Sequence, residues 1–156
     1  MGELTRLIEN GFGKASQYSP EELARYGNVN MNCCEIMLRG ANEVYALGLR
    51  HEDMRLAASF GGGMGIGSIC GAVTGALMVL ALLYGERLEK NTPLKEEITK
   101  PFLRRVRRRL GGLTCAYNKE HHAVLSPFDC SKVILTVAQC LDEEYESRKK
   151  GEANGH

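Results

Sequence analysis

Apolar residues recur every three or four positions over most of the chain, which is the pattern of amphipathic helices. After Asn32, one helix face carries Cys33, Ile36, Met37, Gly40, Ala41, Val44 and Leu47. A further amphipathic helix is expected over residues 51–60. Near the C-terminus, another face carries Cys130, Val133, Ile134, Val137 and Leu141. Little in the sequence suggests a sheet, so the pattern predicts an all-α fold.

Capping residues and breakers indicate where several of these helices begin and end. Ser19–Glu22 has the sequence of a capping box with proline at the first helical position, and Gly27 is expected to stop that helix. Asn32 and Asp129 each precede an apolar face and are placed to cap the helix that follows. Pro101 is expected to interrupt or kink its helix, because proline lacks an N–H and crowds the preceding turn.

The most apolar stretch lies between Arg55 and Glu86, where no charged residue occurs. Its continuously helical part, about residues 69–84, is shorter than the ~20 apolar residues that a membrane span needs. The glycines before it would expose unpaired backbone to lipid. We therefore expect a buried central helix and no membrane span. Gly71 and Gly75 would let another helix approach closely, and helical domains with small-residue faces are also compatible with a homodimer.

Length and charge set limits on the class of protein. A chain of 156 residues can bury one core without disulfides, and we expect residues 1–147 to form a single helical-bundle domain and residues 148–156 to form a disordered tail. Twenty Lys and Arg against nineteen Asp and Glu leave a formal charge of +1, which gives no overall field for nucleic acid or an anionic membrane. No apolar core of signal-peptide length occurs near the N-terminus, so a cytoplasmic protein is expected.

The dense charge block of the chain is a run of arginines, namely Arg104, Arg105, Arg107, Arg108 and Arg109. Such a block is usually the solvated side of a helix, here near Glu96 and Glu97. Aromatic residues for base stacking are scarce around it, which argues against nucleic acid. A redox partner protein with an acidic patch is the more economical functional interpretation.

Six cysteines in a reducing compartment indicate metal ligands or redox thiols rather than structural disulfides. Cys33, Cys70 and Cys130 fall in the first turns of three apolar helices, and Cys115 lies in a segment that can fold over them. Backbone N–H groups and the dipole at a helix N-terminus favour the thiolate form, so Cys70 in particular is expected to be reactive. Four thiolates are the usual ligands of a [2Fe–2S] or [4Fe–4S] cluster or of a structural zinc ion.

The spacing of the cysteines leaves a structural interpretation open. No CxxC pair occurs, so tertiary packing would have to assemble any metal site. Cysteine also behaves as a small hydrophobe, and positions on helix faces alone are equally compatible with packing. Cys34 points away from Cys33, and Cys140 lies about 15 Å of helix beyond Cys130. We expect Cys34 and Cys140 to belong to the core.

Two irregular segments are expected beside these cysteines. The glycine-rich loop over residues 60–67 is followed by no GKS or GKT and preceded by no strand, so its expected role is to let backbone approach the site closely. The cysteine-bearing loop over Leu113–Pro127 contains Cys115, His121 and His122. Both histidines are expected to be solvated, and the alternative is that one of them replaces a thiolate ligand.

The cysteine and glycine motifs resemble the C_GCAxxG_C_C family of redox-active proteins. The resemblance rests on Asn32-Cys33, FGGGMG, CGAVTGALM from Cys70, and the single Cys115 and Cys130, and it runs from about Asn32 to about Leu141. It implies that Cys33, Cys70, Cys115 and Cys130 are the family's four cysteines. Related sequence occurs in split-Soret cytochromes beside an iron–sulfur site, which implies a cluster here. No CxxCH haem-attachment motif is present, so the cytochrome function is not implied.

Three functional hypotheses follow. In the first, the four cysteines bind an iron–sulfur cluster, most simply [2Fe–2S], and the protein transfers electrons. In the second, the protein is a metal-free thiol–disulfide protein in which Cys70 attacks and Cys33 or Cys115 resolves the mixed disulfide. In the third, it is a zinc-stabilised or purely structural helical module that binds a protein through its arginine face.

Overall fold

The protein is built from helices joined by short connections. The computed structural model describes residues 1–14, 19–26, 30–85, 91–126 and 129–154. Its elements are α1 (Glu3–Glu9), α2 (Pro20–Tyr26), α3 (Cys33–Tyr45), the 3₁₀-helix η2 (Asp53–Phe60), the π-type turn η3 (Gly63–Gly67), α4 (Gly71–Tyr84), α5 (Asn91–Pro93), the π-type segment η5 (Leu94–Thr99), α6 (Lys100–Leu110), α7 (Cys115–His122) and α8 (Ser131–Asn154). These ranges contain isolated β-bridges but no strand, so the predicted all-α fold is confirmed.

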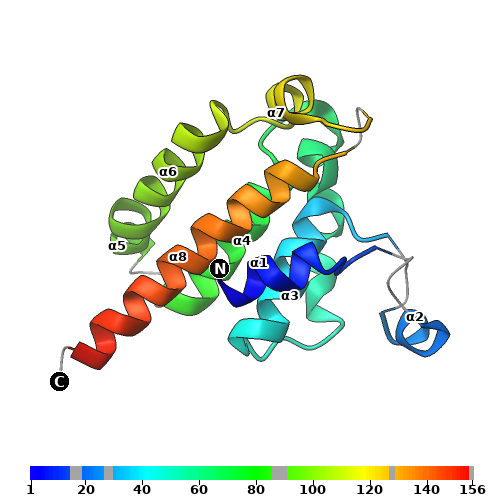
Figure 1. Ribbon diagram of the computed structural model, residues 1–156. Helices are drawn as coiled ribbons and strands as arrows, with labels where there is room; N and C mark the ends of the chain where they lie inside the picture. The colour runs from blue at the N-terminus through cyan, green and yellow to red at the C-terminus, as the bar shows by residue number, and fades with distance from the viewer. Residues whose placement is uncertain (15–18, 27–29, 86–90, 127–128, 155–156) are drawn as a thin grey trace.

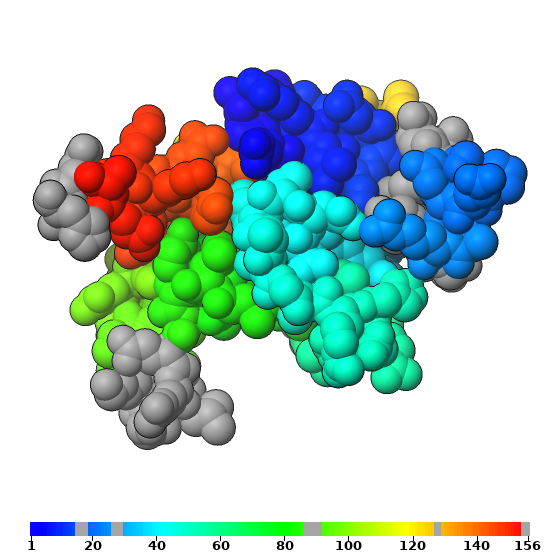
Figure 2. Space-filling view, turned by 90° about the horizontal axis from the view of Figure 1, so that it is seen from below, coloured from blue at the N-terminus to red at the C-terminus, as the bar shows by residue number. Residues whose placement is uncertain are grey.

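Helices α3, α4 and α8 pack against one another at the centre of the molecule (Figure 1). Helix α1 lies against α3 and α8, whereas α6 packs along α8. Helix α7 lies across one end of the bundle, close to the start of α8 (Figure 1). Seen from below, α1, α3 and α4 cover neighbouring parts of the surface, and α2 projects at one side (Figure 2). The N-terminal ends of α3, α4, α7 and α8 are thereby brought to the same region.

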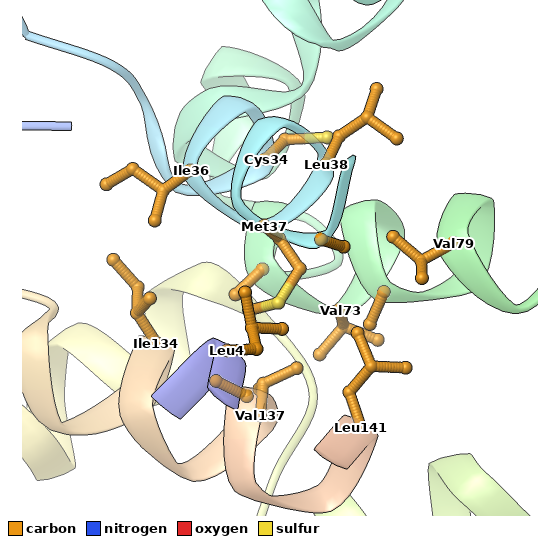
Figure 3. Close-up of a cluster of buried hydrophobic side chains, with 14 of the residues drawn as sticks. Leu4, Cys34, Ile36, Met37, Leu38, Val73, Val79, Ile134, Val137 and Leu141 are labelled. Atoms are coloured by element: carbon orange, nitrogen blue, oxygen red, sulfur yellow. The ribbon is translucent and has the colours of Figure 1, made fainter. Parts of the chain in front are cut away.

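The core lies between α1, α3, α4 and α8. Figure 3 shows side chains from these four helices pointing toward one another, among them Leu4, Met37, Val73, Val137 and Leu141. Burying each large apolar side chain contributes about 1.5–3 kcal/mol. Cys34 and Cys140 are completely buried in this core, as expected from the sequence. A Cβ on Gly75 would lie 2.9 Å from the Cys34 carbonyl oxygen, so this glycine allows the close approach of α3 and α4.

The buried Asp142 carboxylate of α8 joins three helices. It accepts hydrogen bonds from the N–H groups of Leu4 (3.1 Å) and Thr5 (2.8 Å) at the start of α1. It also accepts from the Thr5 hydroxyl (2.7 Å) and from the Tyr45 hydroxyl of α3 (2.7 Å). Burial, together with this hydrogen bond to Asp142, raises the pKa of Tyr45. A carboxylate at the start of α1 also interacts favourably with the helix dipole.

The expected caps are present. In α3, the Glu35 N–H donates to Asn32 Oδ1 (2.9 Å) and the Asn32 N–H donates to the Glu35 carboxylate (3.1 Å). The Ser19–Glu22 capping box forms in the same reciprocal way, whereas Gly27 lies outside the described residues. Asp129 accepts from the Ser131 N–H at the start of α8 (3.1 Å).

Helix α6 presents a core-facing stripe of Phe102, Val106 and Leu110. The hydrogen-bond pattern changes from the π-type of η5 to the α-type of this helix just before its second residue, Pro101. The backbone of Thr99 and Lys100 stays in the right-handed helical region, so the helix changes type beside the proline without a break. On its flank, arginines pair with two glutamates of α8: Arg105 with Glu144 (3.2 Å) and Arg109 with Glu143 (2.7 Å). These acidic partners differ from the expected neighbours Glu96 and Glu97, and Glu96 pairs instead with Lys100 (2.6 Å).

Three predicted segments differ from the structure. The helix expected over 51–60 is the 3₁₀-helix η2. The irregular loop expected over 113–127 is wrong for its first part, because residues 115–122 form α7. The Thr114 hydroxyl caps α7 by accepting from the Tyr117 N–H (3.1 Å). Residue 127 lies outside the described residues.

The expected disordered tail is also wrong over residues 148–154, because α8 continues to Asn154. Arg148 explains part of this extension. Its Nε donates to the Glu144 carboxylate one turn earlier (2.7 Å), and its guanidinium lies 5.0 Å from the centre of the Tyr84 ring. Residues 155–156 lie outside the described residues.

No helix within the described ranges combines the length and the apolar character that crossing a bilayer requires. The most apolar one, α4, has only 14 residues.

Candidate functional site

Four cysteines from four helix starts line one pocket of about 370 Å³. Cys33 is the first residue of α3, and Cys115 is the first residue of α7. Cys70 occupies the N-cap position of α4, and the Cys130 carbonyl accepts from the Ile134 N–H (2.9 Å) in the first turn of α8. The structure therefore brings together all four cysteines that the sequence singled out.

The segments that precede α4 and α7 run antiparallel and are joined by backbone hydrogen bonds. The Cys70 N–H donates to the Leu113 carbonyl (2.8 Å), and the Cys115 N–H donates to the Ser68 carbonyl (2.6 Å). This pairing aligns the starts of two helices that are far apart in sequence. It accounts for the position of Cys115 next to Cys70 at one wall of the pocket.

The start of α3 and the N-terminal segment also line the pocket. The capping box at Asn32 fixes the first turn of α3 and therefore the position of Cys33. The Met31 N–H donates to the Gly13 carbonyl (3.1 Å), which brings Lys14 to the pocket as well. Local capping thus fixes the backbone that carries the Cys33 thiol.

Two glycines make room for the pocket cysteines because they have no side chain. A Cβ on Gly71 would overlap the Cys33 sulfur and lie 2.7 Å from the Phe60 carbonyl oxygen. Gly63 has a φ of +61°, and a Cβ there would lie 2.8 Å from the Cys115 Cβ. Both positions support the expectation that the glycine-rich segment lets backbone approach the site closely.

The four thiols differ in exposure. Cys70 and Cys115 are each 6% exposed, whereas Cys33 and Cys130 are half-buried. The pocket thus has an interior wall and a more accessible side. A group bound by all four thiols would be closest to solvent beside Cys33 and Cys130.

The pKa of Cys70 is raised to about 11, the opposite direction to the lowering expected from its position at a helix start. Burial is the main cause, and the neighbouring thiols of Cys33 and Cys115 add to it. The backbone N–H groups of Val73 and Ala72 act in the opposite direction but are outweighed. Without a cation, Cys70 is therefore a neutral thiol.

The pKa of Cys130 is also raised, first by burial and then by the Cys33 and Cys115 thiols. The neutral thiol is therefore favoured at Cys70 and Cys130, and thiolates in one pocket repel one another unless positive charge enters. A bound metal centre supplies that charge, because metal binding displaces protons from its thiol ligands.

The four thiols and the size of the pocket fit a group that contains more than one metal ion. Within the part of the chain that the structure describes, no three His, Cys, Asp or Glu side chains converge tightly enough to hold a single metal ion. Around one tetrahedral ion, sulfur ligands at ~2.3 Å from the metal would lie only about 4 Å apart. The four thiols instead lie among the residues that line a cavity of about 370 Å³. An iron–sulfur cluster takes its four thiolates at more than one iron, so its ligands are spread more widely.

Residues 31–144 match the family described as "Putative redox-active protein (C_GCAxxG_C_C)". This range is most of the chain and includes all four pocket cysteines. The chain belongs to this family. The resemblance noted from the cysteine and glycine motifs is thereby confirmed over nearly the same range. Neither a curated protein nor a solved structure matches the chain.

In this C_GCAxxG_C_C protein, His121 and His122 lie on α7, outside the set of residues that line the pocket. The exposed His121 ring stacks on Tyr117 (centroids 3.9 Å apart), with its Nδ1 2.9 Å from the Tyr117 carbonyl oxygen. His122 is partly buried, and its Nε2 lies 2.6 Å from the Leu110 carbonyl oxygen. The arrangement favours the thiol set without a histidine ligand.

Sequence reasoning missed Asn118, which is 3% exposed and lines the pocket of this family member. Its Nδ2 donates to the Gly112 carbonyl (3.4 Å). Asn118 lies three residues after Cys115, hence on the same helix face. The N-cap residue Thr114 was the sequence signal for α7, and recognising that helix would have located Asn118 as well.

Proposed function

We propose that Cys33, Cys70, Cys115 and Cys130 bind an iron–sulfur cluster, most simply [2Fe–2S], and that this redox-active protein transfers electrons through it. The observation that carries the proposal is the convergence of four thiols from four helix starts on one pocket of about 370 Å³. Four thiolates are the standard ligand set of both [2Fe–2S] and [4Fe–4S] clusters. When bound, the cluster supplies a centre that gains and loses one electron at a time.

The residues around the pocket support this role in two ways. The N–H groups of Val73 and Ala72 interact favourably with a negative Cys70 sulfur, and hydrogen bonds to ligand sulfur raise the reduction potential of a cluster. Burial of Cys70 and Cys115 keeps water from one wall, while the half-buried Cys33 and Cys130 bring the other side near the surface. An electron can then pass between the buried centre and a docked partner.

The metal-free alternative has less support. A thiol–disulfide protein needs an attacking thiolate, and a Cys70 pKa of about 11 leaves that thiol protonated at neutral pH. A structural zinc ion is the other alternative, and it differs from a cluster in metal content, colour and redox response.

The test is anaerobic purification followed by a visible spectrum and by iron, zinc and acid-labile sulfide analysis. We expect about two irons and two sulfides per chain in the wild type, and loss of both in Cys70→Ala. Cys140→Ala is the matched control, because Cys140 is fully buried in the core and does not line the pocket. It should retain the full iron and sulfide content.

Each other outcome has a defined meaning. Four irons and four sulfides would keep the cluster and change its type to [4Fe–4S]. A colourless wild type without iron, prepared under strict anaerobiosis, would refute the proposal. Stoichiometric zinc without iron would refute it in favour of a structural metal site.

A further inference from the structure

The arginines of α6 form two sets with different surroundings. Arg105 and Arg109 flank the core stripe and pair with glutamates of α8. Arg104, Arg107 and Arg108 are spaced i, i+3 and i+4, on the face opposite that stripe, and they are exposed. Within the described ranges, no carboxylate pairs with these three side chains. We call them the arginine face.

The arginine face borders a surface hollow of about 640 Å³, lined by four arginines together with Pro101 and Gly111. A guanidinium presents a planar fork of N–H donors that matches a carboxylate with two parallel hydrogen bonds. The protein as a whole has a formal charge of only +1, so this positive charge is local. The face therefore suits an anionic surface of limited extent.

Apolar side chains are exposed on the glycine-rich turn η3 and in the segment between it and Cys70. Met64, Ile66 and Ile69 are 48%, 80% and 37% exposed, respectively. Met64 also has a φ of +60°, a conformation that is strained for a residue with a side chain. We call these three residues the apolar rim.

The apolar rim borders the segment before α7, which carries Cys115, and the arginine face lies on α6, the helix that leads into that segment. Ile69 forms a β-bridge with Thr114, the residue before Cys115. Helix α6 ends at Leu110, and the next two residues, Gly111 and Gly112, pack closely on the Tyr117 ring of α7. In Figure 1, α6 leads directly into α7, and the 63–67 turn lies next to α7.

We propose that the apolar rim and the arginine face together dock an electron-transfer protein that presents a cluster of carboxylates. This inference rests on the proposed redox function. Electron-transfer encounters use small interfaces in which opposite charges guide association and apolar contacts form the dry centre. The arginines supply the charge, and the apolar rim supplies the contact beside the cysteine pocket.

Nucleic acid fits this surface less well. Arg104 to Arg108 span only about 6 Å of helix axis, enough for few phosphates, whereas nucleic-acid binders typically neutralise many. The local positive charge is flanked by the glutamates of α8 that pair with Arg105 and Arg109.

The test uses a reduced acidic flavodoxin as the probe, mixed with the oxidised holoprotein in a stopped-flow instrument at about 20 mM and 500 mM salt. One electron leaves the flavin hydroquinone anion, which becomes the neutral semiquinone, and enters the oxidised cluster, so no proton is transferred. We expect the triple variant Arg104→Gln/Arg107→Gln/Arg108→Gln to lower the second-order rate constant about tenfold at low salt, with little difference at high salt. Ile66→Ser should lower the rate at both salt concentrations, because it removes an apolar contact.

The control variant Arg6→Gln/Arg25→Gln/Lys150→Gln removes the same charge from α1, α2 and the end of α8. It should react at nearly the wild-type rate. Iron and sulfide content, and reduction by dithionite, should be the same in all variants, which separates loss of docking from loss of the cluster. Equal rates for the arginine-face variant and the control variant would overturn the proposal.

A binding titration with oxidised flavodoxin at 20 mM salt tests the surface even if no cluster forms. The arginine-face variant should raise Kd at least about tenfold relative to the control variant. An unchanged Kd would overturn the docking proposal separately from the proposed function. Tighter binding of duplex DNA than of flavodoxin at 150 mM salt would assign the surface to nucleic acid instead.

Discussion

Replacing Gly71 with alanine tests whether the cysteine pocket depends on close packing between α3 and α4. Gly71 is the first residue of α4, and the missing side chain leaves room for the Cys33 sulfur of α3. The added methyl group would overlap that sulfur, so we expect Gly71→Ala to abolish or strongly reduce cluster binding while the protein still folds.

The magnitude follows from what surrounds the added methyl group. Its Cβ would lie 2.7 Å from the Phe60 carbonyl oxygen and 3.3 Å from the Cys34 backbone nitrogen, and neither backbone atom can move far. The Cys33 side chain can rotate, so it is the group displaced. Overpacking of this kind costs about 1–3 kcal/mol, and the higher helix propensity of alanine returns up to ~1 kcal/mol. The net loss of unfolding free energy should be no more than about 2 kcal/mol.

The assay compares iron and sulfide per chain with the free energy of unfolding of the apoprotein in urea. Gly75→Ala is the matched control, one turn later on the same helix. Its Cβ would lie 2.9 Å from both the Cys34 carbonyl oxygen and the Met37 Cβ, so it disturbs the same interface without touching a pocket thiol. We expect similar stability losses, and low iron, below half of the wild-type content, in Gly71→Ala alone.

Two results would refute this reasoning. If Gly71→Ala kept the full iron content, the Cys33 sulfur would not need its present position. If both variants lost iron in proportion to their stability loss, general loosening of the α3–α4 interface would explain the effect.

Two further predictions concern stability. Asp142→Ala would leave four buried donors without their acceptor, so it should lower the urea-unfolding free energy by about 3–5 kcal/mol. Tyr45→Phe removes only one of these donors and should lower it by about 1–2 kcal/mol. Equal losses in the two variants would contradict the role of Asp142 in joining three helices. Burial raises the pKa of the Cys34 thiol from 9.0 to about 11, so the unfolded thiol ionises first, and apoprotein stability should be complete below pH 9 and fall between pH 9 and 11. This thiol contributes at most about 2–3 kcal/mol of that fall. Cys34→Ala should therefore flatten the curve of stability against pH, measured by urea unfolding between pH 9 and 11. An unchanged curve would count against burial of Cys34 as the cause of the fall.

Local sequence was sufficient for much of the secondary structure. The apolar spacing after Asn32 and the capping box with Glu35 predicted α3, because both signals act within one or two turns of helix. The same reasoning placed Cys33, Cys70 and Cys130 at helix starts. The tail was mispredicted, because polar composition near Arg148 concealed side-chain contacts with Glu144 and Tyr84.

The pocket itself required contacts between distant segments. Cys115 reaches Cys70 through backbone hydrogen bonds that link residues 68–70 with 113–115, and no local pattern encodes that pairing. Helix α7 was missed because its apolar pattern is weak and its start depends on Thr114 alone as a cap. Periodicity located the individual cysteines but not their common pocket.

The sequence by itself determined the helical class, the helix starts that carry three of the pocket cysteines, and the family, since these depend on local spacing and on motifs. Only the tertiary structure decided that four thiols share one pocket and that the pKa of Cys70 is raised rather than lowered. The helix dipole acts within a single turn and is visible in the sequence. The desolvation that outweighs it depends on which other segments cover the thiol, and those come from elsewhere in the chain.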